Sequence, residues 1–137
     1  MIILVMGLSG SGKTTLAVKL SDYFGCTHIN ADEVRNIHSD WDFSLEGRLR
    51  QAKRLRDLAE GEGPRCVVVD FICPLNEIQK EFPTDYTIWM DTVQTSKYPD
   101  TDSLFEEPKE YNYRIKDWGQ ESFNNIIRSI ENDNTVY

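Results

Sequence analysis

The stretch that decides the fold is "GLSGSGKTTLAVKL", from Gly7 to Leu20. It follows the apolar run "IILVM" and leads into a segment in which Leu16, Leu20 and Phe24 share one helical stripe, before Gly25 ends it. The pattern G-x-x-x-x-G-K-[ST], placed between a buried strand and a helix, is typical of a loop whose backbone N–H groups bind phosphate. The stretch therefore predicts that a nucleoside triphosphate binds at the start of the first helix.

Individual residues of this loop have distinct expected roles. Lys13 is expected to reach the β- and γ-phosphates, and Thr14 to offer its hydroxyl to Mg²⁺. A purely structural glycine turn is the alternative, but the flanking strand and helix favour phosphate binding. ATP and Mg²⁺ are thus the expected cofactors, and the ATP-binding set is Gly7, Ser9, Gly10, Ser11, Gly12, Lys13, Thr14 and Thr15.

Composition narrows the range of partners. The 137 residues are expected to form one domain, 1–137, and 15 basic against 23 acidic residues give a net charge of −8. Such a surface disfavours duplex nucleic acid, and no apolar run reaches the ~18 residues of a membrane span. We read "MIILVM" as a buried strand and not as a signal sequence. Three cysteines without a C-x-x-C pair, Cys26, Cys66 and Cys73, predict reduced thiols in a cytoplasmic protein.

Hydrophobic patterning predicts an α/β fold, a single-domain P-loop NTPase of the nucleotide-kinase type with a mainly parallel five-stranded sheet flanked by helices. Strands are expected at 2–6, 26–30, 65–72, 86–91 and 111–118. Helices are expected at 13–24, 31–37, 44–60 and 119–130, with a short one after Pro74 that ends at about residue 81. Residues 92–109 are polar and contain two prolines, so we expect a long irregular segment of the kind that often forms a lid.

The chain lacks the N-K-x-D motif that reads guanine, and it is too short for a motor or helicase core. A small phosphotransferase fits best, and "NADEVR" (Asn30 to Arg35) then predicts the acceptor side. A carboxylate after a parallel strand lies at the ligand edge of the sheet, where Asp32 could take the proton of an acceptor hydroxyl. Arg35 could clamp an acidic group of the acceptor. The alternative is an N-capping aspartate beside an exposed arginine.

Several motifs together resemble the adenylyl-sulfate kinases, which phosphorylate the ribose 3′-hydroxyl of adenosine 5′-phosphosulfate. The family's G-L-S-G-x-G-K-[ST]-T matches residues 7–15, and its D-G-D-x-x-R is similar to "NADEVR". Its G-F-S-x-x-D-R-x-x-N-x-R-R is similar to "DFSLEGRLRQAKR" at 42–54. Its I-S-P and D-x-x-Y-E-x-P stretches resemble "ICP" at 72–74 and "DSLFEEP" at 102–108.

This resemblance implies roles for further residues. Phe43 and Phe105 would stack on the two faces of the acceptor's adenine, while Arg35 and Arg48 would hold the phosphosulfate. Core packing is the alternative for both rings, and a solvated helix face is the alternative for Arg48. The implied catalytic residues are Lys13, Asp32 and Arg35, and the implied acceptor-binding residues are Arg35, Phe43, Arg48, Gln51, Ile72 and Phe105.

The sequence also departs from the family pattern. Asn30 replaces the first acid of the family's pair, and Asp70 stands where a small residue is usual. Asp70 resembles the strand-end aspartate that supports Mg²⁺ in other phosphate-loop enzymes, so Thr14 and Asp70 are the expected metal ligands; a capped strand end is the alternative. The family's basic lid, R-D-x-K-G-L-Y, is absent, and its substitutes could be Lys97, Lys109 or Arg114.

Three readings therefore stay open. The first is a compact adenylyl-sulfate kinase with a small-molecule acceptor, with no membrane partner and with a homodimer left open. The second is a kinase of another hydroxyl, such as a polynucleotide 5′-end, a nucleoside or a modified nucleotide. The third is a nucleotide-binding module that has lost turnover together with its lid.

Overall fold

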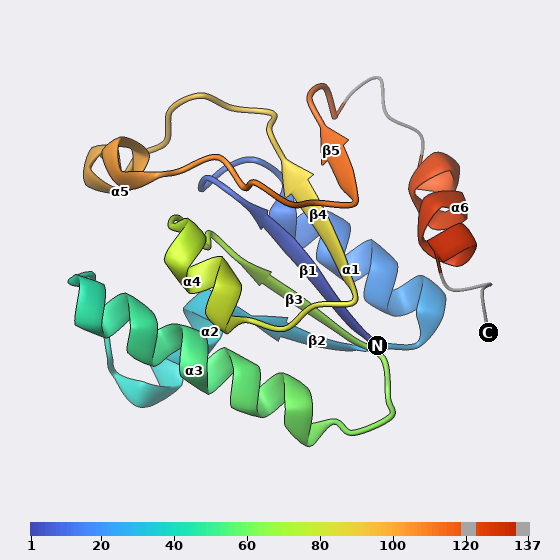
Figure 1. Ribbon diagram of the computed structural model, residues 1–137, viewed down its shortest axis with the longest axis horizontal. Coiled ribbons are helices and arrows are strands. Elements are labelled where there is room, and N and C mark those ends of the chain that lie inside the picture. Colours follow the sequence, from blue (N-terminus) through green and yellow to red (C-terminus); the bar gives the residue numbers. More distant parts are fainter. Residues whose placement is uncertain (119–122, 134–137) are drawn as a thin grey trace.

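The computed structural model describes residues 1–118 and 123–133. Within these residues, five parallel strands form a sheet in the order β2-β3-β1-β4-β5 (Figure 1). The strands are β1 (Ile2–Gly7), β2 (Thr27–Asn30), β3 (Val67–Phe71), β4 (Tyr86–Met90) and β5 (Tyr113–Ile115). The helices are α1 (Lys13–Phe24), α2 (Ala31–His38), α3 (Leu45–Gly61), α4 (Asn76–Glu81), α5 (Pro99–Leu104) and α6 (Phe123–Asp133). The predicted P-loop α/β fold is confirmed.

Helices cover both faces of the sheet, as its apolar strands require. Ile3 and Val5 of β1 point to the face covered by α1 and α6, and Leu4 and Met6 point to the face covered by α2, α3 and α4. All four side chains are fully buried. Burial of each such side chain contributes about 1.5–3 kcal/mol, so the central strand is a rigid support for the loop that follows it.

Strand register brings the predicted polar residues to the C-terminal edge of the sheet. Asp70 of β3 lies between Asn30 of β2 and Val5 of β1 in the pairing of the strands. The loop that follows β1 begins at the same edge, and α5 lies beyond the C-terminal ends of the strands in Figure 1. The phosphate-binding loop, Asn30 at the end of β2 and Asp70 near the end of β3 therefore lie together at one corner of the molecule.

One expectation about secondary structure needs revision, and another is only partly covered by the described residues. The segment 92–109 contains the short helix α5, whose first residue is Pro99 and whose first turn carries Asp100 and Asp102. These are ordinary signals of a helix start, and they were present in the sequence. The last helix begins at Phe123 in the structure, and the part of the prediction that covers 119–122 lies outside the described residues.

The prediction of three reduced thiols is wrong for two of them. Cys26 and Cys66 form a disulfide with Cα atoms 4.7 Å apart, across a sequence separation of 40. This pairing can be inferred only from the strand register: Thr27 pairs with Val67, so the residues directly before them, Cys26 and Cys66, must also be neighbours. Cys73 is a free, buried thiol. The inference of a cytoplasmic location, which rested on reduced thiols, loses that support.

Across the described part of the chain, no helix has the length and apolar character needed to cross a bilayer.

Candidate active site

The loop between β1 and α1 is shaped by its glycines. Gly7 lies so close to β4 that a Cβ added to it would be 2.5 Å from the carbonyl oxygen of Met90. Gly12 has φ 98° and is the N-cap of α1, a conformation that side chains with a Cβ rarely adopt. Thr92, which follows β4, stabilises the loop: its Oγ1 donates a hydrogen bond to the carbonyl of Ser11 at 2.7 Å. The first turn of α1 is thereby presented with its N–H groups open toward the sheet edge.

The side chains of this loop fit a phosphate ligand. Ser11 Oγ is buried and has no hydrogen-bond partner among the described residues, so a phosphate oxygen would satisfy it. Lys13 Nζ donates to the carbonyl of Leu8 at 3.2 Å and so lies across the loop. Burial lowers the pKa of Lys13, while the charges of Asp70 and Asp32 act in the opposite direction. An anion beside Lys13 would offset this burial cost.

Asp70 is the centre of a polar cluster beside the loop. Its side chain is 3% exposed, and its Oδ1 accepts a hydrogen bond from Thr14 Oγ1 at 3.1 Å. Asn30 Nδ2 donates to both carboxylate oxygens, at 3.1 and 3.3 Å. His28 Nε2 contacts Oδ2 at 2.5 Å, and this hydrogen bond raises the pKa of His28. A buried carboxylate and a hydroxyl side by side are oxygen ligands of the type that Mg²⁺ takes.

Asn30 explains why this cluster tolerates the loss of the family's first acid. Its Oδ1 accepts from the backbone N–H of Glu33 at 2.9 Å and so caps α2, while its Nδ2 faces Asp70. A second carboxylate in its place would face Asp70 at hydrogen-bond distance. The amide therefore supplies the N-cap without like-charge repulsion.

A cavity of about 330 Å³ joins the loop to the predicted acceptor side. Asp32 lies in its wall, one residue into α2 after Asn30, and its side chain is exposed. Three cations and three carboxylates line it: Lys13, Lys97, Arg48, Asp32, Asp70 and Asp100. Aromatic side chains line it as well: Trp41, Phe43, Phe71 and Tyr98. The predicted ATP-binding loop, the predicted base and one predicted stacking residue thus open onto the same space.

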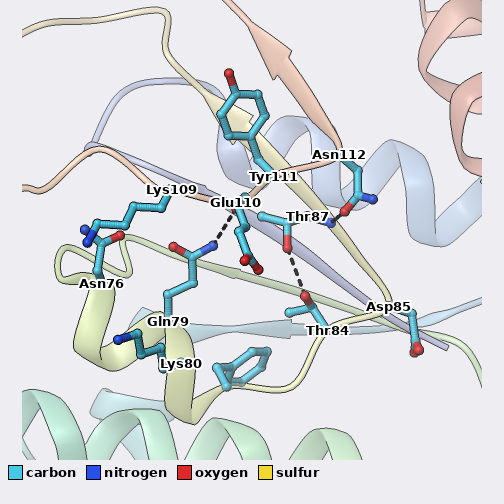
Figure 2. Close-up of a pocket in the computed structure, with 11 residues that line it drawn as sticks. Asn76, Gln79, Lys80, Thr84, Asp85, Thr87, Lys109, Glu110, Tyr111 and Asn112 are labelled. Carbon is cyan, nitrogen blue, oxygen red and sulfur yellow. Dashed lines mark hydrogen bonds between the residues drawn. The ribbon is translucent and has the colours of Figure 1, made fainter.

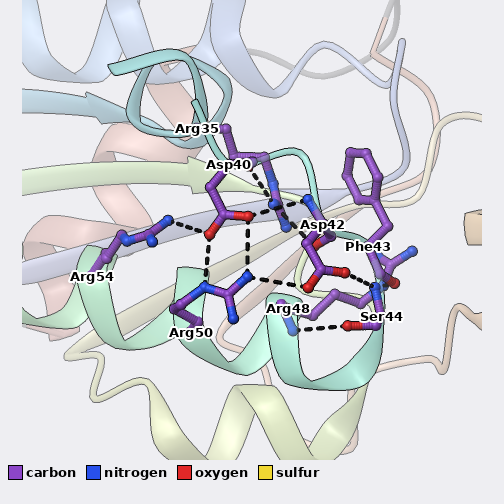
Figure 3. A network of polar contacts seen from close by, with 9 residues as sticks. Arg35, Asp40, Asp42, Phe43, Ser44, Arg48, Arg50 and Arg54 are labelled. Atoms are coloured by element: carbon purple, nitrogen blue, oxygen red, sulfur yellow. Dashed lines mark hydrogen bonds and ion pairs between the residues drawn. The ribbon is translucent and has the colours of Figure 1, made fainter. Parts of the chain in front are cut away.

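Phe43 is held at this cavity by two arginines (Figure 3). The Arg35 guanidinium lies 4.5 Å from the centroid of its ring and that of Arg48 lies 5.4 Å away. Arg48 Nε also donates to the carbonyl of Phe43 at 2.8 Å. Arg35 Nη1 donates to the carbonyls of Asp40 and Asp42, at 2.9 and 3.2 Å. The structure therefore places Arg35 behind Phe43, where it holds the loop 40–43, and does not bring it to the 330 Å³ cavity.

The same loop is fixed from its outer side by an ion-pair network, also visible in Figure 3. Asp40 pairs with Arg50 and with Arg54, each at 2.8 Å, and Asp42 pairs with Arg50 at 3.2 Å. The hydrogen bond from Arg50 holds the pKa of Asp40 well below its usual range. Ser44 caps α3 by accepting from the backbone N–H of Gly47 at 3.2 Å.

The remaining acceptor-side predictions divide into two groups. Gln51 is 2% exposed, donates to the carbonyl of Ala31 at 2.8 Å, and lines a small adjoining cavity of about 50 Å³ together with Arg35. Ile72 lines both cavities. Phe105, in contrast, packs against the hydrophobic core and lines a different cavity with Leu8 and Trp89, so the structure does not bring it together with Phe43.

The three residues proposed to replace the missing basic lid lie in different parts of the structure. Lys97 lies in the wall of the 330 Å³ cavity. Arg114 is paired with Asp91 at 2.5 Å and lies over the ring of Trp89. Lys109 lines a second, larger cavity of about 590 Å³ between α4 and the segment before β5 (Figure 2). None of the predicted ATP-binding, catalytic, acceptor-binding or metal residues lines that larger cavity.

Sequence reasoning missed four residues of this site. Trp41 and Tyr98 supply rings to the cavity wall, and Thr101 accepts from Arg48 Nη2 at 3.2 Å. His28 contacts Asp70. A signal existed for His28, because it precedes Asn30 by two residues on one strand and must share its face. Trp41 could be recognised in the sequence as an aromatic residue near Phe43, but no local pattern placed Tyr98 in the same cavity.

Comparison with known proteins shows the family and the fold of this chain. Residues 1–110 match the family model described as adenylylsulphate kinase. An adenylylsulphate kinase from Mycobacterium tuberculosis has a TM-score of 0.71 at 19% identity, over 96% of this chain and 94% of that one. Shikimate kinase from Aquifex aeolicus has a TM-score of 0.67 at 15% identity, over 100% of both chains. A hexameric adenylylsulphate kinase from Thiobacillus denitrificans has a TM-score of 0.69 at 20% identity, over 96% of this chain and 29% of that one. A search of curated proteins gave no significant match.

Proposed function

This chain belongs to the adenylylsulphate kinase family, and from that premise we propose that it transfers the terminal phosphoryl group of ATP to the 3′-hydroxyl of adenosine 5′-phosphosulfate. The observation that supports this best is the single cavity that Lys13, Asp32 and Phe43 line together. A phosphate site, a candidate base and a stacking surface are the parts that such a transfer needs.

On the ATP side, atoms of the loop and of the start of α1 provide most of the contacts to the phosphates. The N–H groups at the start of α1 and the hydroxyl of Ser11 bind the phosphates, and Lys13 moves from the Leu8 carbonyl to the β- and γ-phosphates. Thr14 and Asp70, whose side-chain oxygens lie 3.1 Å apart, would hold Mg²⁺. When bound, Mg²⁺ neutralises charge that develops on the transferring group.

On the acceptor side, we assign Asp32 as the general base. As the acceptor oxygen attacks the terminal phosphorus, the hydroxyl proton passes to the Asp32 carboxylate, the bond to the bridging oxygen breaks, and ADP leaves. Asp32 is an exposed carboxylate of the cavity wall, and it also lines the small adjoining cavity with Phe43 and Arg48, which the other exposed carboxylate, Asp100, does not. General bases of this kind contribute on the order of 10²–10⁴-fold to a rate.

The structure changes which residues we propose to hold the acceptor. The adenine would stack on Phe43, and Tyr98, which lines the same cavity, would take the role that the resemblance gave to Phe105. Lys97 and Arg48 would face the phosphosulfate, while Arg35 acts through the position of Phe43. Gln51 presents a buried Oε1 without a partner among the described residues, which would accept from a ligand N–H or O–H that reaches the small cavity.

A coupled assay of ADP release tests the proposal. The acceptors compared are adenosine 5′-phosphosulfate, single-stranded DNA with a 5′-hydroxyl, adenosine, shikimate and no acceptor. We expect ADP release to depend on adenosine 5′-phosphosulfate. Dependence on the oligonucleotide or on shikimate would replace the proposed acceptor. Release that no acceptor alters would show a hydrolase, and no release at all would support a binding module.

A further inference from the structure

His28 is a half-buried residue whose contact with Asp70 has no role in the proposed chemistry. It lies on the edge strand β2, two residues before Asn30, and pairs in register with Val68. Asp70 is two residues further along β3 on the same face, so the imidazole reaches it diagonally across the two strands. The His28 side chain is 21% exposed, and that of Asp70 is 3% exposed.

The two carboxylate oxygens of Asp70 contact different partners. Oδ1 faces the loop, where Thr14 Oγ1 lies 3.1 Å away. Oδ2 faces away from the loop and contacts His28 Nε2 at 2.5 Å. Asn30 Nδ2 spans both oxygens at 3.1 and 3.3 Å. The carboxylate is thus held at the oxygen that does not face Thr14, and the other oxygen stays beside the hydroxyl.

We propose that His28 is a positioning residue for the metal site: it fixes the carboxylate of Asp70 so that Oδ1 and Thr14 Oγ1 face one Mg²⁺ together. The inference rests on the proposed function to the extent that it needs a metal–nucleotide complex at the loop. It does not depend on which acceptor is phosphorylated.

The physical reason is rotational freedom of a ligand. A carboxylate at the end of a strand can turn about its terminal bond unless an outer partner holds it. Partners that hold a metal-binding side chain from behind typically change metal affinity by about 10- to 100-fold when they are removed. Asn30 alone cannot replace His28, because its amide is nearly equidistant from both oxygens and does not distinguish them.

The test measures Mn²⁺ binding by electron paramagnetic resonance in the presence of ADP, and ADP binding in EDTA by calorimetry. The variants are His28→Ala, His28→Gln, which keeps a side-chain N–H donor, and His38→Ala. His38 is exposed at the end of α2 and serves as the matched control.

We expect His28→Ala to weaken Mn²⁺ binding by about 10- to 100-fold. His28→Gln should recover most of that loss, and His38→Ala should bind Mn²⁺ as the parent does. All variants should bind ADP in EDTA within about threefold of the parent, because the loop itself is untouched.

Two results would overturn the inference. One is Mn²⁺ binding by His28→Ala within about twofold of the parent. The other is an equal loss of ADP binding in EDTA, which would show general damage to the site. If the unsubstituted protein binds neither ADP nor Mn²⁺, the proposed function fails and takes the inference with it. If it binds both but does not phosphorylate adenosine 5′-phosphosulfate, only the choice of acceptor fails.

Discussion

Replacement of two aromatic residues distinguishes the acceptor site implied by family resemblance from the acceptor site that we propose. Resemblance pairs Phe43 with Phe105, whereas the structure places Tyr98 in the cavity and Phe105 against the core. Tyr98 is 45% exposed, and its ring is approached by Lys97 Nζ at 5.2 Å from the centroid. We therefore expect Tyr98→Ala to weaken acceptor binding and Phe105→Ala to weaken the fold.

The magnitudes follow from these positions. Stacking of a base on an aromatic ring contributes about 1–3 kcal/mol. Since 1.4 kcal/mol is tenfold, Tyr98→Ala should raise the KM for adenosine 5′-phosphosulfate by about 5- to 150-fold. Phe105 is partly buried, so its loss should cost about 2 kcal/mol of unfolding free energy, near half of the 3–5 kcal/mol for a fully buried ring. For a chain of this size, that lowers Tm by about 6–10 °C.

The assays are steady-state kinetics at saturating ATP and thermal unfolding followed by circular dichroism. Tyr98→Phe is the control, because it keeps the ring and should hold KM within about twofold. The reasoning is refuted if Phe105→Ala raises the acceptor KM as much as Tyr98→Ala does, with an unchanged Tm. That result would restore the pairing of Phe43 with Phe105.

Three further changes test other parts of the site. Asp32→Asn should slow phosphoryl transfer by about 10²–10⁴-fold and change ATP affinity by less than about threefold; equal losses, measured by single-turnover kinetics and calorimetry, would make Asp32 structural. Asn30→Asp puts a second carboxylate beside Asp70, so the Tm should fall by several degrees, which corresponds to about 1–3 kcal/mol of unfolding free energy. Added Mg²⁺ should restore part of the lost stability. An unchanged Tm would contradict the geometry of the cluster. Gly47→Ala places a Cβ 2.2 Å from the carbonyl oxygen of Asp42 and should lower the free energy of unfolding, measured by chemical denaturation, by about 1–3 kcal/mol. Gly61→Ala is the control and should not destabilise the protein, because a Cβ there meets nothing within 4 Å. Equal effects of the two substitutions would refute the clash.

The sequence could predict the sheet and the loop because both depend on local signals. The apolar run before Gly7, the spacing of Leu16 and Leu20, and the stop at Gly25 lie within a few residues of one another, and α1 has the expected bounds. The same holds for Ser44, which caps α3. Local pattern was insufficient for α5, where helix signals stand in a polar segment with no apolar stripe.

Contacts between strands and between distant loops were beyond local pattern. The Cys26–Cys66 disulfide needs the register of β2 and β3, and the position of Tyr98 needs the path of the chain after β4. Arg35 shows a subtler limit. Its spacing after Asp32 predicted that the two residues lie together, and both line the small cavity, but spacing cannot tell whether a guanidinium binds a ligand or the carbonyls of its own chain.

The use of carbonyls as partners has an electrostatic consequence for the site. Hydrogen bonds to carbonyl oxygens satisfy the donors of Arg35 without cancelling its charge, whereas Arg50 and Arg54 are paired with the carboxylate of Asp40. The chain as a whole has 23 acidic and 15 basic residues, but three cations and three carboxylates line the cavity, and Arg35 stands directly behind Phe43. The cavity is therefore far less negative than the protein around it. An acidic protein can in this way offer two anionic substrates a site without net negative charge, because the cations of the cavity wall balance its carboxylates.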